Sequence, residues 1–194
     1  LPAYARAVRA QAPAAALDAL DRVRVLAAHR AGATGVAGLN AACVAELVAQ
    51  HALPRAAREA PWFAGMPVLV TANDPALELA NGEVGVVLAD AGGALRCWFR
   101  DGAGVRHVAP ARLPAHEPVF AMTVHKSQGS EFESVVLVLP PRPSPVLTRE
   151  LLYTGLTRAR ARVVLLGSEA VVRAAIEERV QRASGVREAL WGVT

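Results

Sequence analysis

Two short segments in the C-terminal half of the chain carry residues suited to phosphate chemistry. The first, at 123–132, reads TVHKSQGSEF and contains Lys126, the only lysine of the chain. The second, at 151–166, reads LLYTGLTRARARVVLL and sets Arg158 and Arg160 just ahead of an apolar run. Glycine and small hydroxyl residues let a backbone come close to an anion, and guanidinium groups neutralise phosphate. Together the two segments predict a phosphate-handling site.

The N-terminal part of the chain reads as helices followed by a strand–loop–helix unit. Residues 3–20 are rich in alanine and are broken by Pro13, which predicts two short helices. Residues 22–26 alternate between arginine and apolar side chains and then continue as an apolar run. This pattern is typical of a strand that enters a buried sheet. After a glycine-bearing loop, apolar residues at 36–47 recur at helical spacing, and Thr34 is the predicted N-cap of that helix. Such a unit is the repeating piece of an α/β sheet.

The same pattern returns in the C-terminal part of the chain. Apolar runs at 134–140 and 162–167 predict two buried strands. Between them Thr148 is the predicted cap of one helix, and Ser168 begins a final helix that ends near Arg182. We therefore expect an α/β domain built on a parallel sheet.

The middle of the chain has a different pattern of apolar residues and turns. Short apolar runs follow one another closely and are separated by glycine-bearing turns, of which Asn81-Gly82 is the strongest signal. The predicted strands lie at 66–72, 83–88, 94–100 and 105–109. Several short strands at this spacing predict a small antiparallel barrel or sheet, inserted between the two α/β parts.

The composition is that of a folded protein. The 194 residues are 53% apolar with a mean hydropathy of +0.29, enough to bury one core or a core with a small satellite domain. No apolar run approaches the roughly 20 residues that a membrane-spanning helix needs. Cys43 and Cys97 lack metal-ligand spacing and the histidines are scattered, so we expect free buried thiols in a cytoplasmic protein and no metal site. The absence of an initial methionine suggests a fragment of a longer chain.

Positive charge is distributed unevenly along the chain. The net charge is only +4, but the isoelectric point is 9.8. The stretch from Arg96 to Arg112 holds four arginines and His107 against one aspartate, and the stretch from Arg142 to Arg162 holds five arginines against one glutamate. Such patches fit a polyanionic partner. The alternative is an ordinary solvated surface.

The two chemistry-bearing segments also resemble known motifs. TVHKSQGSEF (123–132, here called the motif V segment) resembles motif V of superfamily 1 helicases, and LLYTGLTRARARVVLL resembles motif VI. From about 20 to 183 the chain is similar to the C-terminal part of the RecD family, the α subunits of exodeoxyribonuclease V. The stretches that carry this wider resemblance are GVAGLN, PVLVTANDPALELANGEVGVVL, ARLPAHE and PVLTRELLYT.

The resemblance implies a domain organisation. Residues 21–66 and 118–183 would form the second RecA-like motor domain, 2A, of P-loop NTPase type with a parallel sheet. Residues 67–117 would form an inserted small SH3-like β-barrel, 2B. Residues 1–20 would be a helical lead-in, and residues 184–194 a tail.

The resemblance also implies a function, as the C-terminal part of an ATP-dependent 5′-to-3′ DNA helicase in recombinational DNA repair. The expected partners are single-stranded DNA and the RecB and RecC subunits, with no membrane. ATP and Mg²⁺ would be bound mainly by an upstream motor domain, because no G-x-x-x-x-G-K-[ST] phosphate loop occurs in the sequence. We therefore expect the chain to hydrolyse nothing by itself.

Two arginines are the candidate catalytic residues by this resemblance. Arg158 matches the motif VI arginine and would be an arginine finger, which is worth about 10³–10⁵ in the rate of phosphoryl transfer. Arg30 matches the motif IV position and would hold a second phosphate oxygen. The alternative for both is a surface or interface arginine that binds a helix end or a carboxylate. Arg160 is expected to be an ordinary surface charge.

Motif V would face the nucleotide with one part and DNA with another. Gln128, Gly129 and Glu131 are the candidate nucleotide-binding residues: the glycine permits close backbone approach, and the glutamate matches a residue on the ribose or γ-phosphate side. For Glu131 the alternative is a solvated carboxylate.

The candidate DNA-binding residues carry donors for phosphate oxygens. They are Thr123, His125, Lys126 and Asn40. A buried histidine and a surface lysine are the alternatives for His125 and Lys126. For the chain as a whole, the competing interpretation is a non-catalytic module that holds DNA passively or mediates subunit assembly.

Overall fold

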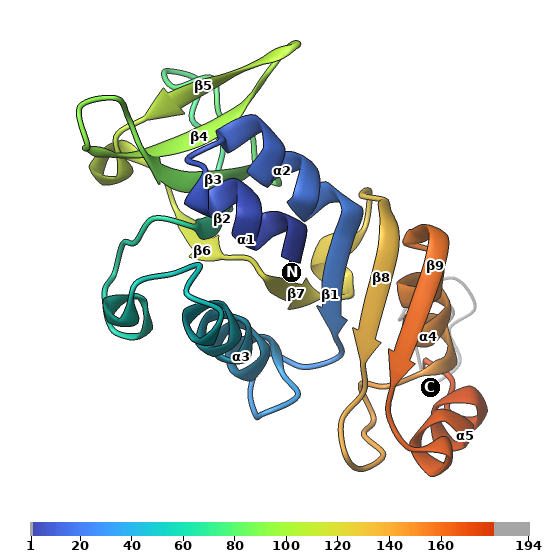
Figure 1. Cartoon of the computed structure of the whole chain (residues 1–194). Helices are drawn as coiled ribbons and strands as arrows, with labels where there is room; N and C mark the ends of the chain where they lie inside the picture. The colour runs from blue at the N-terminus through green and yellow to red at the C-terminus, as the bar shows by residue number, and fades with distance from the viewer. Residues whose placement is uncertain (1, 181–194) are drawn as a thin grey trace.

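The computed structural model of the chain describes residues 2–180, and its elements form two sheets. The four-stranded sheet is parallel, in the order β7-β1-β8-β9. Its strands are β1 (Val23–Ala27), β7 (Ala121–Thr123), β8 (Phe132–Val138) and β9 (Ala159–Leu166). Figure 1 shows this sheet beside the antiparallel one, with β7 as the strand nearest to it. The predicted α/β class with a parallel sheet is confirmed.

The second sheet has five strands and is antiparallel, in the order β5-β4-β3-β2-β6. Its strands are β2 (Met66–Val70), β3 (Val84–Ala89), β4 (Leu95–Asp101), β5 (Gly104–Val108) and β6 (His116–Pro118). In β4 the predicted alternation is present, since Cys97 and Phe99 are fully buried while Arg100 is exposed. This sheet is the β-rich unit that the turn signals predicted.

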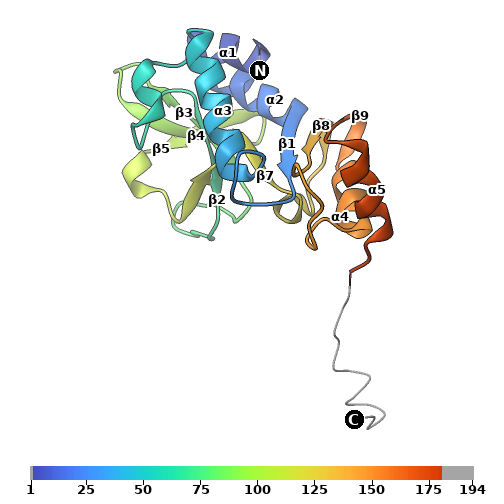
Figure 2. The same cartoon turned by 90° about the horizontal axis from the view of Figure 1, so that it is seen from below.

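Helices and single turns cover the sheets. The helices are α1 (Pro2–Arg9), α2 (Pro13–Arg22), α3 (Val36–Ala49), α4 (Arg149–Leu156) and α5 (Glu169–Glu177). The 3₁₀ turns are η1 (Arg55–Arg58), η2 (Pro110–Arg112) and η3 (His125–Ser127). Figure 2 shows α3 on the side of the antiparallel sheet and α4 and α5 near β9.

Two of the predicted helix N-caps, Thr148 and Ser168, are confirmed, and the third, Thr34, is wrong. The hydroxyl of Thr148 accepts a hydrogen bond from the backbone of Leu151, and the hydroxyl of Ser168 accepts one from Val171, as the sequence predicts for N-caps. Thr34 is not a cap: α3 begins after Gly35, which has no side chain to offer. Here the N–H of residue 36 bonds instead to the carbonyl of His29 across the loop.

The end of the chain departs from the prediction in two ways. The sequence predicts a buried β9, but it is the edge strand of the parallel sheet and pairs only with β8 among the described residues. Leu166 is 50% exposed as a result. The final helix ends at Glu177, short of Arg182, and residues 184–194 lie outside the described residues. Among residues 2–180, no helix is long and apolar enough to cross a membrane.

Two hydrophobic cores hold the fold together. One joins α1, α2 and α3 to the antiparallel sheet, and Phe120 closes it, with Tyr4 edge-on to the Phe120 ring at 5.8 Å between centroids. The other joins the parallel sheet to α4 and α5. The N-terminal helices therefore pack on the antiparallel sheet, although they precede the first parallel strand in sequence.

Candidate functional site

The motif V segment lies on the connection between two parallel strands that flank a third. β7 and β8 both pair with β1, so the chain leaves β7 at Thr123, turns through η3 and returns to the start of β8 at Phe132. Gly129 has φ +85°, a left-handed conformation that favours glycine, although a side chain there would meet nothing within 4 Å. The connection therefore favours glycine at position 129 because of its backbone conformation and not because space is short. The space beside Gly129 is open.

The α4–β9 connection brings motif VI against this segment. The N–H of Phe132 donates to the carbonyl of Arg158 at 2.8 Å, and Phe132 is in register with Ala159. The Arg158 guanidinium donates to the carbonyls of Ser130 at 3.3 Å and Thr154 at 3.2 Å. These bonds are at the long end of the range, so the guanidinium is held only loosely.

Glu131 and Arg160 form an ion pair at the same edge. Arg160 Nε lies 2.9 Å from Glu131 Oε2, and the two side chains are 69% and 55% exposed. Exposed pairs of this kind contribute little to stability, so the carboxylate can exchange its partner at small cost. Arg160 is an exposed surface arginine, as the sequence predicts, and Glu131 is its partner. Arg158 and Glu131 lie on neighbouring parts of one surface.

Arg30 lies elsewhere. It follows the carboxyl end of β1, whereas Arg158 precedes the amino end of β9. Because all four strands are parallel, the two arginines lie at opposite ends of the sheet. The structure does not bring Arg30 together with Arg158, and its catalytic role stays a prediction.

The candidate DNA-binding residues of motif V differ in their exposure. Thr123 is buried, and its hydroxyl accepts from the N–H of Lys126 at 3.3 Å. His125 is exposed. The ammonium of Lys126 lies 2.5 Å from a carboxylate oxygen of Glu117, on the short strand β6. Lys126 therefore links the two sheets in this structure, and a phosphate would have to replace Glu117.

Asn40 needs a correction. Its amide nitrogen donates to the carbonyls of Val36 and Ala121, and its oxygen accepts from the N–H groups of Phe120 and Ala121. Two donors and two acceptor sites are all that an asparagine amide has. One donor bonds the carbonyl of Val36 on its own helix, and the other three groups hold Phe120 and Ala121, at the start of β7, on α3. Asn40 therefore has no group left for DNA, and we do not retain it in the DNA-binding set.

Asn40→Ala is expected to destabilise the fold, because the N–H groups of Phe120 and Ala121 lose their acceptor. Each buried group left without a partner costs about 1–3 kcal/mol. Urea unfolding would measure this as a lower midpoint with an unchanged slope. The exposed Gln50, whose side chain bonds Glu46 at the end of α3, offers a control, and Gln50→Ala should change stability far less. An Asn40→Ala protein of full stability would contradict the structural role.

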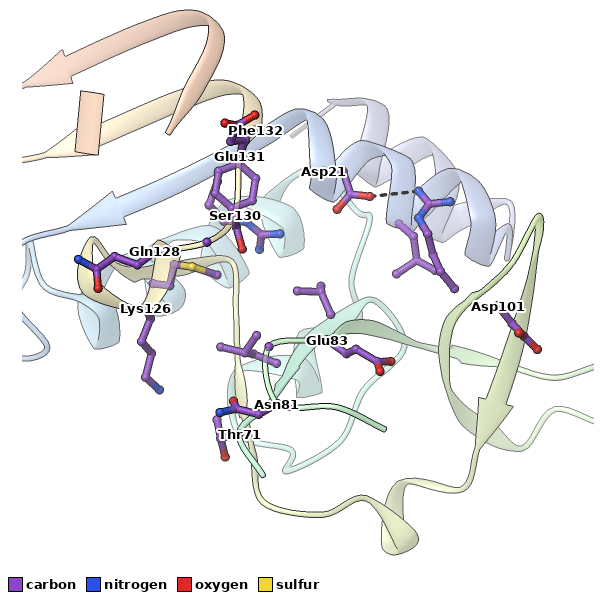
Figure 3. Close-up of a pocket in the computed structure, with 18 of the residues that line it drawn as sticks. Asp21, Thr71, Asn81, Glu83, Asp101, Lys126, Gln128, Ser130, Glu131 and Phe132 are labelled. Atoms are coloured by element: carbon purple, nitrogen blue, oxygen red, sulfur yellow. Dashed lines mark hydrogen bonds and ion pairs between the residues drawn. The ribbon is translucent and has the colours of Figure 1, made fainter. Parts of the chain in front are cut away.

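A cavity of about 1140 Å³ lies between the motif V segment, α2 and the antiparallel unit. The parallel side contributes residues of the motif V segment, and the antiparallel side contributes Asn81, Glu83 and Asp101 (Figure 3). The predicted site residues on its wall are Lys126, Gln128, Gly129 and Glu131. His125 instead lines a second cavity of about 670 Å³ beside α4, and Gln128 borders both.

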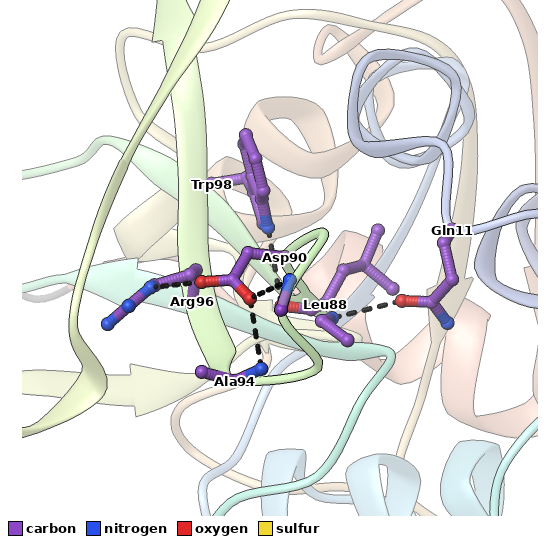
Figure 4. A network of polar contacts seen from close by, with 8 residues as sticks. Gln11, Leu88, Asp90, Ala94, Arg96 and Trp98 are labelled. Atoms are coloured by element: carbon purple, nitrogen blue, oxygen red, sulfur yellow. Dashed lines mark hydrogen bonds and ion pairs between the residues drawn. The ribbon is translucent and has the colours of Figure 1, made fainter.

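The basic stretch from Arg96 to Arg112 is not a free positive patch. Asp90 accepts from Arg96 Nε at 2.8 Å and from the backbone of Ala94 and Gly92 (Figure 4). The hydrogen bond from Ala94 is the main cause that lowers the pKa of the Asp90 carboxyl. Arg100 pairs with Asp18 and with Asp21 on α2.

Arg106 is also engaged inside the fold. It donates to the carbonyls of Leu77 and Glu78 at 2.8 and 2.7 Å. Three of the four arginines in this stretch, Arg96, Arg100 and Arg106, thus hold the antiparallel unit together and fasten it to α2. Neither carboxylate–arginine pairing nor carbonyl binding can be read from the local sequence, which shows only an excess of arginine.

One residue beside the site, Arg24, is not among those that the sequence motifs predict. Arg24, in the middle of the alternating run at 22–26, is 1% exposed. Burial lowers the pKa of its guanidinium to about 10, so it stays charged at neutral pH. The only available signal was an arginine inside a run that predicts a buried strand.

The motif resemblance is confirmed by comparison with known proteins. The UvrD-like helicase C-terminal domain family matches residues 118–166. The RecBCD enzyme subunit RecD of Mycobacterium tuberculosis is 49% identical over 172 residues, which is 89% of this chain and 29% of the relative. RecD of Haemophilus influenzae is 39% identical over 96% of this chain and 27% of the relative. The ATP-dependent RecD2 DNA helicase of Deinococcus radiodurans is 39% identical over 64% of this chain.

These matches cover most of this chain but only a small part of each relative. The chain spans less than a third of the length of these curated relatives. Among solved structures, Bacteroides Pif1 bound to single-stranded DNA aligns with 99% of this chain and 54% of that protein, at 17% identity and a TM-score of 0.48.

Proposed function

We infer that this chain is the C-terminal motor segment of a RecD-type, ATP-dependent DNA helicase. The observation that carries the inference is the contact between the two motif segments: Arg158 donates to Ser130, beside the carboxylate of Glu131. An arginine finger supplied by one domain has to be accessible, so that it can reach a phosphoryl group bound by another domain. Sequence identity of 49% to a RecD subunit over most of the chain supports the same assignment.

The residues of this chain fit one side of a nucleotide. Bound ATP with Mg²⁺ would supply the phosphoryl group, and Arg158 would neutralise the negative charge that develops on it. Glu131 would exchange Arg160 for a hydroxyl of the ribose, and the open backbone at Gly129 would allow close approach. The metal would be held mainly by the upstream motor domain, as the resemblance implies.

The other parts of the proposal concern DNA and domain organisation. We propose that Thr123, His125 and Lys126 face single-stranded DNA, with translocation in the 5′-to-3′ direction. The antiparallel sheet would be an SH3-like barrel, 2B, inserted at 67–117 into a RecA-like domain 2A at 21–66 and 118–183. Because relatives are named as RecBCD subunits, RecB and RecC are the proposed protein partners, and recombinational DNA repair is the proposed process.

The proposal is tested with the full-length protein. We expect ATP hydrolysis that single-stranded DNA stimulates, and unwinding of a duplex with a 5′ single-stranded tail but not of one with a 3′ tail. The 194-residue chain alone should hydrolyse no ATP above background in the same assay, because it lacks the phosphate loop. Full-length protein that binds DNA without any ATPase activity would instead favour the non-catalytic module.

A further inference from the structure

Arg24 is a buried charge with two defined contacts. Its side chain leaves β1 with 1% of the residue exposed. Nη1 donates to the carbonyl of Val119 at 2.8 Å. The guanidinium carbon lies 5.0 Å from the centroid of the Phe132 ring, within the range of a cation–π interaction.

These contacts lie at the two ends of the strand–loop that carries motif V. Val119 comes just before β7, and Phe132 is the first residue of β8. β1 lies between these strands and pairs with both. A single side chain of the central strand therefore holds the entry to β7 and the exit from the motif V segment at a fixed separation.

Burial of the Arg24 side chain lowers the stability of the fold. Its Nε and Nη2 atoms are buried and have no hydrogen-bond partner among the described residues. Desolvation by burial is the main cause of the lowered pKa, which Asp21 and then Tyr4 partly oppose. A buried charge can often be replaced by an apolar side chain of similar volume with no loss of stability. Stability alone therefore does not account for an arginine at this position.

We propose that Arg24 is a positioning residue for the motif V segment. It acts through Val119 and Phe132 on Glu131, next in sequence to that ring, and on Thr123, at the end of β7. A planar guanidinium suits this task because its edge can donate to a carbonyl while its face lies on a ring. The inference rests on the proposed helicase function, in which the two sides of motif V must keep a fixed geometry.

The first test compares Arg24→Met with Arg22→Met in the full-length protein. Arg22 is exposed at the end of α2, two residues away, and is the matched control. We expect Arg24→Met to lower kcat of DNA-stimulated ATP hydrolysis about tenfold to a hundredfold, as a displacement of site groups by about 1 Å does. The melting temperature should stay within a few degrees of the parent value, because the variant loses one hydrogen bond but also a buried charge.

The conservative variant separates positioning from charge. Arg24→Lys keeps the positive charge but offers no planar group, so we expect it to restore part of kcat and not all of it. KM for ATP should change less than kcat in both variants, because most of the nucleotide is held by the upstream domain. The proposal would be overturned if Arg24→Met kept the parental kcat. It would also be overturned if the loss of activity were fully explained by a smaller fraction of folded protein.

The second test does not depend on catalysis. Amide hydrogen exchange over residues 123–132 should be faster in Arg24→Met and unchanged in Arg22→Met, because the segment loses its anchor at both ends. If the full-length protein proves not to be an ATPase, this result still decides whether Arg24 positions the segment. Equal exchange in both variants would refute the positioning role, whatever the fate of the proposed function.

Discussion

Replacing Arg158 by alanine in the full-length protein is expected to lower DNA-stimulated ATP hydrolysis by about 10³–10⁵-fold. In the proposed function Arg158 brings positive charge to the phosphoryl group in the transition state, and its loss is equivalent to about 4–7 kcal/mol of activation free energy. Steady-state ATPase assays at saturating DNA would measure it. KM for ATP should change little, since the interaction is made in the transition state and not in the ground state.

The fold should survive this substitution. Arg158 is half-buried, and its hydrogen bonds to Ser130, Thr154 and Thr157 are between 3.2 and 3.4 Å long. Losing three long bonds to groups at a partly exposed edge costs little. Melting temperature and DNA affinity therefore serve as checks that the lost activity is not lost structure.

Two further variants make the result specific to Arg158. Arg158→Lys should remain severely impaired, because an ammonium group lacks the forked geometry that binds two phosphate oxygens. Arg173→Ala removes an exposed arginine of α5 whose partner among residues 2–180 is Glu169 on its own helix, and it should leave kcat unchanged. A motor in which Arg158→Ala retains most of its activity would exclude the arginine-finger role and would favour a non-catalytic module.

The features of the fold that could be predicted from sequence are those that depend on neighbours in the chain. Thr148 and Ser168 cap their helices because the acceptor and donor are three residues apart. The alternation in β4 is likewise local. The prediction of a buried β9 is wrong because burial depends on the elements on either side of a strand, and an apolar run looks the same at the edge of a sheet as in its centre.

The candidate site shows the same division. The motif residues themselves supplied the prediction that motifs V and VI act together, and the structure places Arg158 against Ser130. The partners of Lys126, Asn40 and Arg24 could not be read from the sequence, because Glu117, Ala121 and Val119 reach them only through the topology of the sheets. Asn40 in particular is a candidate by resemblance, yet its whole amide bonds backbone groups of its own helix, of Phe120 and of β7.

The hydrophobic cores group the helices and strands differently from the domains that the resemblance implies. The resemblance places residues 21–66 in the motor domain and 67–117 in an insertion. In the structure α3, within 21–66, shares a hydrophobic core with the antiparallel sheet, and α2 is fastened to β4 by the pairing of Arg100 with Asp18 and Asp21. We therefore expect α1, α2 and α3 to unfold together with the antiparallel sheet.

Phe99→Ala tests this coupling and should be strongly destabilising. The Phe99 ring is fully buried and covers Gly85, where a Cβ atom would lie 2.5 Å from Phe99 Cε1. Removing such a ring typically costs about 3–5 kcal/mol, because a cavity remains where it packed. Urea unfolding would measure the loss. Leu166→Ala, at a half-exposed position of β9, is the control and should cost less than about 1 kcal/mol.

Amide exchange in the Phe99→Ala protein then distinguishes one shared core from two independent domains. Because Phe99 belongs to the core that includes Leu17 of α2 and Leu47 of α3, exchange should accelerate in those helices as much as in β3 and β4. Protection of Val135 and Leu137 in β8, which belong to the other core, should fall less. If α2 and α3 instead kept parental protection while the antiparallel strands lost theirs, the sheet would be an independent insertion, and the boundary at 66–67 would be the physical one.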